Sequence, residues 1–510
     1  MAKRERLVSG LIACAILITN VQLNYRTWPI VWPDEALFSS PAATLAEQGV
    51  FATPVLAGLI PQMEQATLWN CPLYMVLLSA VYTVTGESLR AARTLNLAIA
   101  CVTIFVFMGL LGKLRLSRKV IGLCLAALVF DMTFLRSANV ARMDALALLF
   151  FLSTIYVLVR ARNADRGYPG RVCFLAGLLT GLAAASHPIA IMLIPVLLIL
   201  LPVRLKNYTL VFAGVVLALS PWLVYIAFHF EAFQVQFLSQ LTRKFELLLA
   251  LSEDTLQAQE SSETGGIARV FAAQYGGTRV MMILALAVYG GVLVVTALAF
   301  FEQWRRPGAL STDGRMYLIA LVVFVLVLVA SEAWYPQFVG PCFIVAAAIA
   351  FERGQPAWSR LLRRQALLSL VGAGLLFFMV FTIRERWSYG MPAVLERRVS
   401  DLADATRGCK SVYLRVRPDP YFVLRKKYPQ VQPLEFIPGK LTYPGMAEQL
   451  GHRLDEIDCF LLDDHDDWEP LITSYLESRR DQFATTRLDD SPGPSRIYET
   501  RARLLRRRAQ

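Results

Sequence analysis

Two neighbouring carboxylates, Asp34 and Glu35 in the stretch WPDEA, follow the first apolar segment of the chain closely. Carboxylates at a membrane edge serve as general bases, as ion-pair partners or as caps of helices. Directly after Pro33, the two acids also suit the first turn of a short amphipathic helix that runs from Ala36 to Gln48. From the pair alone, helix capping and catalysis explain these residues equally well.

Other charged and polar residues fall at the ends of later apolar spans, on the same predicted side of the membrane. They are Arg90, Arg93, Arg136, Arg142, Asp144, His187, Glu332, Tyr335 and Gln337. Several of them have their own structural explanation, because Arg90 and Arg93 can extend to lipid headgroups, Arg142 can pair with Asp144, and His187 can cap a helix. Their joint occurrence at one face favours a charged cavity, since isolated charge at that depth is costly.

The composition indicates a membrane protein with many spans. The chain has 510 residues, of which 56% are hydrophobic and 18% charged, and its mean hydropathy is +0.48. Apolar stretches long enough to cross about 30 Å of hydrocarbon recur from residue 7 to residue 383. We expect about eleven crossings, at residues 7–24, 90–112, 119–136, 141–159, 172–187, 188–203, 208–228, 279–301, 316–331, 338–352 and 366–383.

The Lys and Arg residues between the spans predict the topology. Loops rich in these residues stay in the cytoplasm, which places the N-terminus inside and three regions outside. The outer regions are a first loop at 25–70, a second loop at 229–277, and everything after residue 383. The apolar run 72–85 would break this parity if it crossed, so we expect it to be an interfacial helix. The polar second loop suits a lid over a cavity and a plain linker equally.

The chain divides into a transmembrane domain at 1–383 and a C-terminal domain at 384–510. The second alternates β-rich and helical stretches, which predicts a small α/β domain on the outer side. Within it, Cys409 and Cys459 would form a disulfide if their strands are neighbours. Asp463 and the acids after it read as a solvated turn, and the terminal RARLLRRR as a contact for anionic headgroups.

The order of these motifs resembles a known family. WPDEA, NCPLY, GESLRAAR, ARMDA and ASHP occur in the order seen in the GT-C class of integral-membrane glycosyltransferases, in particular family 39 and the lipid A aminoarabinose transferase type. The resemblance extends over about residues 5 to 350. It implies a mainly helical GT-C fold of about eleven transmembrane helices with juxtamembrane helices, followed by the soluble α/β domain.

The resemblance also implies roles for individual residues. Asp34 matches the catalytic base of the family and Glu35 its acidic neighbour. The residues expected to bind the donor phosphate are Arg90, Arg93, Arg136, Arg142 and His187. Those expected to line the cavity are Asn70, Tyr74, Asp144, Glu332, Tyr335 and Gln337. Asn70 and Cys71 depart from the family, which carries a basic residue and a proline there, so phosphate binding must be distributed differently.

The implied activity is an inverting transfer of a sugar from a polyprenyl monophosphate to a lipid, glycan or protein acceptor, on the outer face of a bacterial inner membrane. Asp34, Glu35, Asp144 and Glu332 could hold Mg²⁺ or Mn²⁺, although no spacing motif supports a metal site. The net charge of +12 needs no nucleic acid, because most of it lies in the inner loops. A polyprenyl-linked glycan transporter is the alternative, but the internal repeats typical of transporters are not evident.

Overall fold

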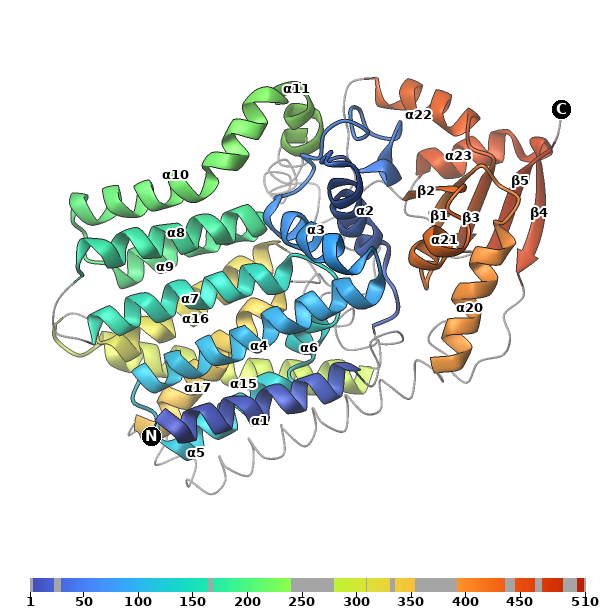
Figure 1. The fold of residues 1–510 in the computed structure, drawn as a ribbon. Helices are drawn as coiled ribbons and strands as arrows, with labels where there is room; N and C mark the ends of the chain where they lie inside the picture. The colour runs from blue at the N-terminus through green and yellow to red at the C-terminus, as the bar shows by residue number, and fades with distance from the viewer. Residues whose placement is uncertain are drawn as a thin grey trace, which may run out of the picture.

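The computed structural model describes residues 3–22, 29–163, 168–239, 279–308, 310–330, 335–353, 392–435, 445–463, 470–488 and 502–508. Long helices lie side by side at one end of the molecule, and a small α/β domain lies at the other (Figure 1). Helices α2 and α3 lie between these two parts. This arrangement places the carboxylate pair at the junction of the bundle and the C-terminal domain.

The bundle and the segments above it are built from helices of very different lengths. In chain order they are α1 (Lys3–Gln22), α2 (Pro33–Gln48), η1 (Pro54–Leu56), α3 (Leu73–Thr85), α4 (Leu89–Lys113), α5 (Arg118–Phe130), α6 (Met132–Ala138), α7 (Asp144–Arg162), α8 (Gly170–Ser186), η2 (Pro188–Met192), α9 (Leu193–Leu200), α10 (Leu205–Phe228), α11 (Phe230–Phe233), η3 (Gln234–Leu238), α15 (Arg279–Trp304), α16 (Thr312–Ala330) and α17 (Pro336–Arg353).

Within the described residues, three helices are long and apolar enough to cross a membrane on their own: α4, α7 and α10. A fourth is added if α5 and α6 form one bent span. The predicted spans 7–24, 172–187, 279–301, 316–331 and 338–352 all coincide with helices, while 366–383 lies outside the described residues. The count of eleven crossings therefore stays a prediction.

The predicted span 119–136 is not one straight helix, and whether it crosses the membrane stays a prediction. The chain bends by 63° between α5 and α6. Asp131 sits at the bend and accepts hydrogen bonds from the backbone N–H of Thr133 (2.8 Å) and Phe134 (2.9 Å), so it caps a new helix. Tyr289 of α15 donates its hydroxyl to the other oxygen of Asp131 at 3.0 Å. The predicted span 188–203 also divides, because η2 precedes α9.

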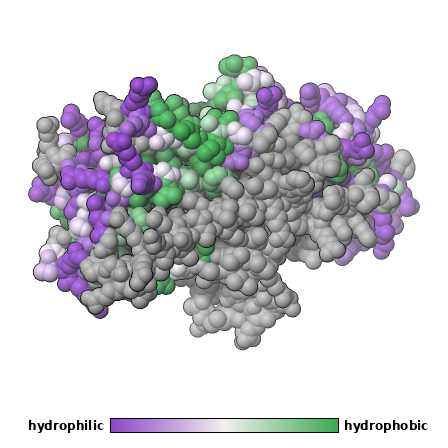
Figure 2. Space-filling view, turned by 90° about the horizontal axis from the view of Figure 1, so that it is seen from below, coloured by the Kyte–Doolittle hydropathy of each residue, from purple (hydrophilic) through white to green (hydrophobic). Residues whose placement is uncertain are grey.

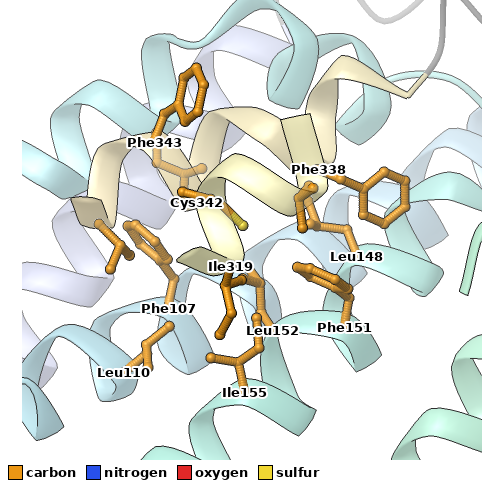
Figure 3. Close-up of a cluster of buried hydrophobic side chains, with 14 of the residues drawn as sticks. Phe107, Leu110, Leu148, Phe151, Leu152, Ile155, Ile319, Phe338, Cys342 and Phe343 are labelled. Atoms are coloured by element: carbon orange, nitrogen blue, oxygen red, sulfur yellow. The ribbon is translucent and has the colours of Figure 1, made fainter. Parts of the chain in front are cut away.

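The core of the bundle is apolar and closely packed. Phe107, Phe151, Phe338 and Ile319 from four different helices meet in one buried cluster (Figure 3). Helices α8 and α10 approach so closely that a Cβ atom at Gly177 would lie 2.0 Å from the Val211 carbonyl oxygen. Small residues permit such backbone contact between membrane helices, where dispersion rather than the hydrophobic effect drives packing.

The outer surface of α10 stays largely uncovered. Phe212 is 68% exposed and Leu217 55%, which is typical of a lipid-facing helix. In the space-filling view, apolar side chains gather in a patch toward the upper left, and hydrophilic side chains lie at the left and right edges (Figure 2). An apolar patch next to hydrophilic side chains at the left edge fits a membrane-embedded bundle with a polar end.

Helix α3 coincides with the predicted interfacial segment 72–85. Its 13 residues span about 20 Å at about 1.5 Å per residue, less than the thickness of the hydrocarbon layer. It packs against α2, where Tyr82 donates its hydroxyl to Ser39 at 2.9 Å. Its position relative to the membrane stays a prediction. Its contact with α2 shows that it supports the helix that carries Asp34.

The C-terminal domain is an α/β sandwich, as the alternating pattern predicts. Its sheet has the strand order β2-β1-β3-β5-β4, with β1 parallel to β2 and β3, and β5 antiparallel to β3 and β4. In chain order the elements are α20 (Pro392–Ala405), β1 (Ser411–Arg415), α21 (Tyr421–Lys427), β2 (Gln432–Glu435), α22 (Met446–Asp455), β3 (Cys459–Asp463), α23 (Pro470–Ser478), η4 (Arg480–Gln482), β4 (Phe483–Leu488) and β5 (Ala502–Arg507).

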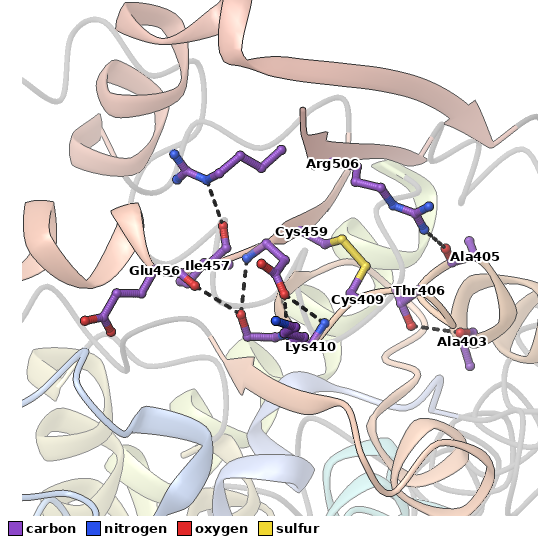
Figure 4. The surroundings of a disulfide bond; sticks show 12 residues. Ala403, Ala405, Thr406, Cys409, Lys410, Glu456, Ile457, Cys459 and Arg506 are labelled. Carbon is purple, nitrogen blue, oxygen red and sulfur yellow. Dashed lines mark hydrogen bonds between the residues drawn. A yellow bond between two sulfur atoms is a disulfide. The ribbon is translucent and has the colours of Figure 1, made fainter. Parts of the chain in front are cut away.

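The disulfide between Cys409 and Cys459 is confirmed, and the condition on which it depended is met. Val412 of β1 pairs directly with Cys459 of β3, so the two strands are neighbours. Asp458 accepts a hydrogen bond from the backbone N–H of Lys410 at 2.8 Å beside the bridge (Figure 4). The bridge ties the segment before β1 to the start of β3.

One reading of this domain is wrong and another stays a prediction. The basic terminal stretch forms β5, which lies between β3 and β4, with Leu504 and Leu505 buried and Arg503 and Arg506 exposed. A contact of these arginines with anionic headgroups stays a prediction. Asp463 is not part of a solvated turn, since it is only 3% exposed at the carboxyl end of β3. The acids that follow it lie outside the described residues.

Two carboxyl groups, Asp419 and Glu435, are buried together where the domain meets α2. They are 2% and 0% exposed. Burial raises the pKa of Asp419 to about 7, the backbone N–H of Tyr421 lowers it in part, and the nearby Glu35 raises it further. Burial and then the neighbouring Asp419 raise the pKa of Glu435. The junction is therefore most stable when the pair holds a proton.

This arrangement predicts a pH-dependent stability. The pKa of the Asp419 carboxyl is about 7 in the folded protein and 3.8 in its reference state. Its contribution to the free energy of unfolding is therefore present in full below about pH 3.8 and is lost as the pH rises through about 7. Asp419→Asn cannot ionise, so the fall in Tm between about pH 5 and about pH 8 becomes smaller than in the wild type. Thermal unfolding of the solubilised protein measures this. Asp481→Asn, at an exposed aspartate, keeps the wild-type slope, and equal slopes for wild type and Asp419→Asn would contradict the assignment.

Candidate active site at the start of α2

Asp34 is the second residue of α2, at the end of the bundle that faces the C-terminal domain. Its side chain keeps 17% of its surface exposed, whereas that of the adjacent Glu35 is fully buried. Arg142 forms an ion pair with Asp34 through Nη1. Of the two acids, Asp34 is therefore the one that a bound substrate can reach.

Arg142 joins two carboxylates. Besides Asp34, it binds Asp144, with Nε 2.9 Å from Oδ2, and its guanidinium lies 5.9 Å from the centre of the Phe38 ring. The pairing of Arg142 with Asp144 was one of the structural explanations that the sequence allowed. It does not exclude a functional role, because the same guanidinium also reaches Asp34.

Asn96, a polar residue within α4, holds the turn that carries Arg142. Its side-chain amide donates to the carbonyl oxygens of Arg142 (2.8 Å) and Ser137 (3.2 Å), and the side chain is completely buried. This residue was missed in the sequence. The signal was an asparagine inside an apolar span, since such residues generally have a partner.

Glu35 and Arg93 form a buried ion pair next to Asp34. Arg93 donates from Nε (2.9 Å) and Nη2 (2.5 Å) to the two carboxylate oxygens, and both residues are at most 1% exposed. Glu35 also accepts from the backbone N–H of Trp32 at 3.2 Å and of Ala141 at 2.9 Å. The capping function expected for an acid at this helix start is thus performed by Glu35, together with a link to α4.

His187 continues the row of charged groups that begins at Asp34. Its Nδ1 accepts from the backbone N–H of Ile189 at 2.9 Å, which is the expected cap, and its Nε2 lies 3.6 Å from Asp144 Oδ1. The Tyr335 ring packs edge-on against the imidazole, with 5.3 Å between ring centres. Asp34, Arg142, Asp144, His187 and Tyr335 therefore form one continuous chain of contacts.

Tyr74 of α3 is a further polar residue near the site. It is fully buried, packs edge-on against Phe38 with 5.9 Å between ring centres, and its hydroxyl has no hydrogen-bond partner among the described residues. Burial raises the pKa of Tyr74, and the nearby Tyr82, Glu35 and Asp144 raise it further. The hydroxyl is therefore a neutral donor in the neighbourhood of the Glu35 and Asp144 carboxylates.

The other predicted site residues differ in their surroundings. Asn70 accepts from the Cys71 backbone N–H at 2.8 Å, which shapes the turn before α3. Gln337 is 1% exposed, and its amide nitrogen has no hydrogen-bond partner within the described part of the chain. Arg90 is exposed and Arg136 is half-buried. Glu332 lies outside the described residues.

The described residues contain no group of three or more His, Cys, Asp or Glu side chains placed to hold a metal ion. Asp34 and Asp144 instead converge on Arg142. A metal requirement stays a prediction.

No family profile and no curated protein matches the sequence. The structure is similar to that of ArnT from Cupriavidus metallidurans bound to undecaprenyl phosphate, with a TM-score of 0.59, 13% identity, and coverage of 99% of this chain and 98% of ArnT. For ArnT in the apo state the TM-score is 0.56 at 13% identity, covering 98% and 97%. The Archaeoglobus fulgidus oligosaccharyltransferase, tethered with an acceptor peptide, gives 0.52 at 12% identity, covering 91% of this chain and 69% of its own.

These likenesses extend over the helical bundle and the C-terminal domain alike, since nearly the whole chain is covered. At 13% identity they show the fold and not the substrate. The resemblance seen in the motif order is thereby confirmed at the level of architecture: this chain has the GT-C fold.

Proposed function

We propose that this protein transfers a sugar from a polyprenyl monophosphate to an acceptor, with inversion at the anomeric carbon and with Asp34 as the general base. The single observation that supports this most strongly is the ion pair between the partly exposed Asp34 and Arg142. It puts a proton acceptor beside a permanent positive charge at the end of a GT-C bundle. The fold shared with ArnT in complex with undecaprenyl phosphate supports the class of donor.

In the reaction, a hydroxyl or amine of the acceptor attacks the anomeric carbon of the donor sugar. The bond between that carbon and the phosphate oxygen breaks, the acceptor proton passes to Asp34, and polyprenyl phosphate leaves. A single displacement inverts the anomeric configuration. The acceptor is a lipid, a glycan or a protein, and its identity is not implied by the geometry.

The departing phosphate needs positive charge near the end of the bundle. Arg142 is suited to this role because the fork of N–H donors of a guanidinium fits phosphate oxygens. Arg142 is held between Asp34 and Asp144, with His187 next to Asp144, so a phosphate at this position would compete with the carboxylates for the guanidinium. Arg90, Arg93 and Arg136 are the further candidates for this role, and Arg93 would first have to leave its pair with Glu35.

Asp34→Asn tests the assignment of the base. The amide cannot accept the acceptor proton, so kcat falls by at least about 100-fold while the donor KM changes little. Transfer of radiolabelled sugar from polyprenyl phosphate in membranes measures this. Glu64→Gln, at an exposed carboxylate of the same predicted loop, keeps the wild-type rate. Full activity of Asp34→Asn would exclude Asp34 as base, and movement of the lipid-linked sugar without a new glycosidic bond would favour the transporter.

Arg142→Gln tests the phosphate site. Loss of a charge-assisted contact weakens binding of polyprenyl phosphate by about 10- to 100-fold, since such bonds contribute about 1.5–3 kcal/mol. A titration with polyprenyl phosphate in detergent measures the Kd, with and without EDTA to show whether Mg²⁺ or Mn²⁺ takes part. The matched control is Arg118→Gln, because Arg118 lies in an exposed ion pair with Glu5 at the opposite end of the bundle. Unchanged affinity in Arg142→Gln would remove Arg142 from the phosphate site.

Glu35→Gln separates the structural acid from the catalytic one. It leaves the Arg93 guanidinium buried without a counter-charge, and breaking a buried pair in this way costs about 3–5 kcal/mol. The Tm of Glu35→Gln therefore falls by several degrees, whereas Asp34→Asn, at a partly exposed site, stays near the wild type. Thermal unfolding of the two variants side by side measures this. A larger loss of stability in Asp34→Asn would reverse the two roles.

A further inference from the structure

The C-terminal domain touches the chain immediately before Asp34. The loop 416–420 follows β1 and lies against residues 31 and 32. The backbone N–H of Asp419 donates to the Val31 carbonyl oxygen at 3.0 Å. The guanidinium carbon of Arg417 lies 5.1 Å from the centre of the Trp32 ring, within the range of a cation–π contact. Trp32 is the N-cap of α2, so these contacts act on the residue from which the helix of Asp34 starts.

This loop is itself held in place by its own domain. Asp463, at the carboxyl end of β3, accepts from the backbone N–H of Arg417 at 3.2 Å and lies 3.7 Å from its Nε. Asp419 accepts from the backbone N–H of Tyr421 at 2.8 Å, which starts α21. Both carboxylates are at most 3% exposed. These hydrogen bonds hold the loop in place at the carboxyl ends of β1 and β3.

Helix α21 continues the contact to the other end of α2. Tyr421 donates its hydroxyl to Glu87 at 2.6 Å, directly before the N-cap Ser88 of α4. Arg425 lies 3.2 Å from Glu87 and 3.6 Å from Glu47 in the last turn of α2. The C-terminal domain therefore contacts the chain at the N-cap of α2 and in its last turn, and it also binds Glu87 next to the start of α4.

The opposite side of the helix start is bound to the bundle. Glu35 accepts from the Trp32 backbone N–H and is paired with Arg93, which also donates to the Pro29 carbonyl oxygen at 3.0 Å. The segment before Asp34 thus lies between two sets of contacts, from α4 on one side and from the loop 416–420 on the other. Removal of either set frees the first turn of α2 to shift.

We propose that Arg417 and Asp419 are positioning residues for the reaction: through Trp32 and Val31 they orient the first turn of α2 and hence the carboxylate of Asp34. The inference rests on the proposed function of Asp34. A displacement of about 1 Å at a reacting group costs about 100-fold in rate, so a contact of this kind acts on turnover and not only on stability. The C-terminal domain then forms part of the catalytic centre without touching substrate.

The test compares variants of the full-length protein in vesicles that contain a polyprenyl-phosphate sugar. Arg417→Ala lowers kcat by about 10- to 100-fold and leaves the donor KM within about twofold, because the phosphate site is unchanged. Arg417→Lys, which keeps a cation over the indole, recovers part of the rate. Arg487→Ala is the matched control, since Arg487 is an exposed arginine of β4 at the other edge of the sheet.

A double-mutant cycle with Trp32→Leu shows whether the effect passes through the indole. If it does, Arg417→Ala lowers kcat less in the Trp32→Leu background than in the wild type. Full additivity would overturn this route, as would an Arg417→Ala variant whose kcat stays within about twofold of the wild type.

Hydrogen exchange keeps the inference separable from the proposed function. In Arg417→Ala the amides of residues 31–36 exchange faster, while those in the middle of α4 do not change. Unchanged exchange at 31–36 would overturn the positioning inference. If the wild type transfers no sugar from any polyprenyl phosphate, the proposed function fails, and the exchange data still decide whether the domain orders the start of α2.

Discussion

The buried ion pair between Glu35 and Arg93 is the interaction on which the arrangement of the site depends. It connects the first turn of α2 to α4, and through the Ala141 N–H it also reaches the turn that carries Arg142. Taking two charges out of water is costly, and here further hydrogen bonds from Arg93 to the Pro29 carbonyl and to Glu35 from the Trp32 and Ala141 N–H groups offset part of that cost. Asp34 and Arg142 come from distant parts of the chain. Glu35 holds the segments of both residues, because it lies next to Asp34 in α2 and binds the Ala141 N–H next to Arg142.

The elements that could be predicted from the sequence are those that periodicity and charge determine. The apolar spans, the short helix at 72–85, the helix start at WPDEA and the α/β character of the C-terminal domain all depend on local patterns. The break at Asp131 could not be predicted in this way. Asp131 caps α6 through the nearby backbone N–H groups of Thr133 and Phe134, but its second oxygen is paired with Tyr289, more than 150 residues away, and that contact leaves no local pattern.

The sequence predicts which residues belong to the site better than it predicts which of them pair with each other. Residue type and position brought Asp34, Arg142, Asp144 and His187 to one face, but they left open which carboxylate each cation would bind. Arg93, expected at the donor phosphate, is engaged by Glu35 in this structure. No local pattern in the sequence indicates a role for Arg417, because its contact is with the Trp32 ring, almost 400 residues earlier in the chain. Contacts of this kind are tertiary, and no motif spacing records them.

The same reasoning explains how a GT-C fold is compatible with 13% identity to ArnT. Apolar residues in membrane helices can be exchanged widely while volume and hydropathy are kept, because any of them satisfies the lipid and the neighbouring helices. A polar site has no such freedom, since every buried charge needs a partner of opposite sign at hydrogen-bond distance. In this chain Asp34 and Asp144 share one cationic partner, Arg142. Under the proposed function, a phosphate that draws the guanidinium toward itself would loosen its hold on Asp34, and one side chain would then couple binding of the donor to exposure of the base.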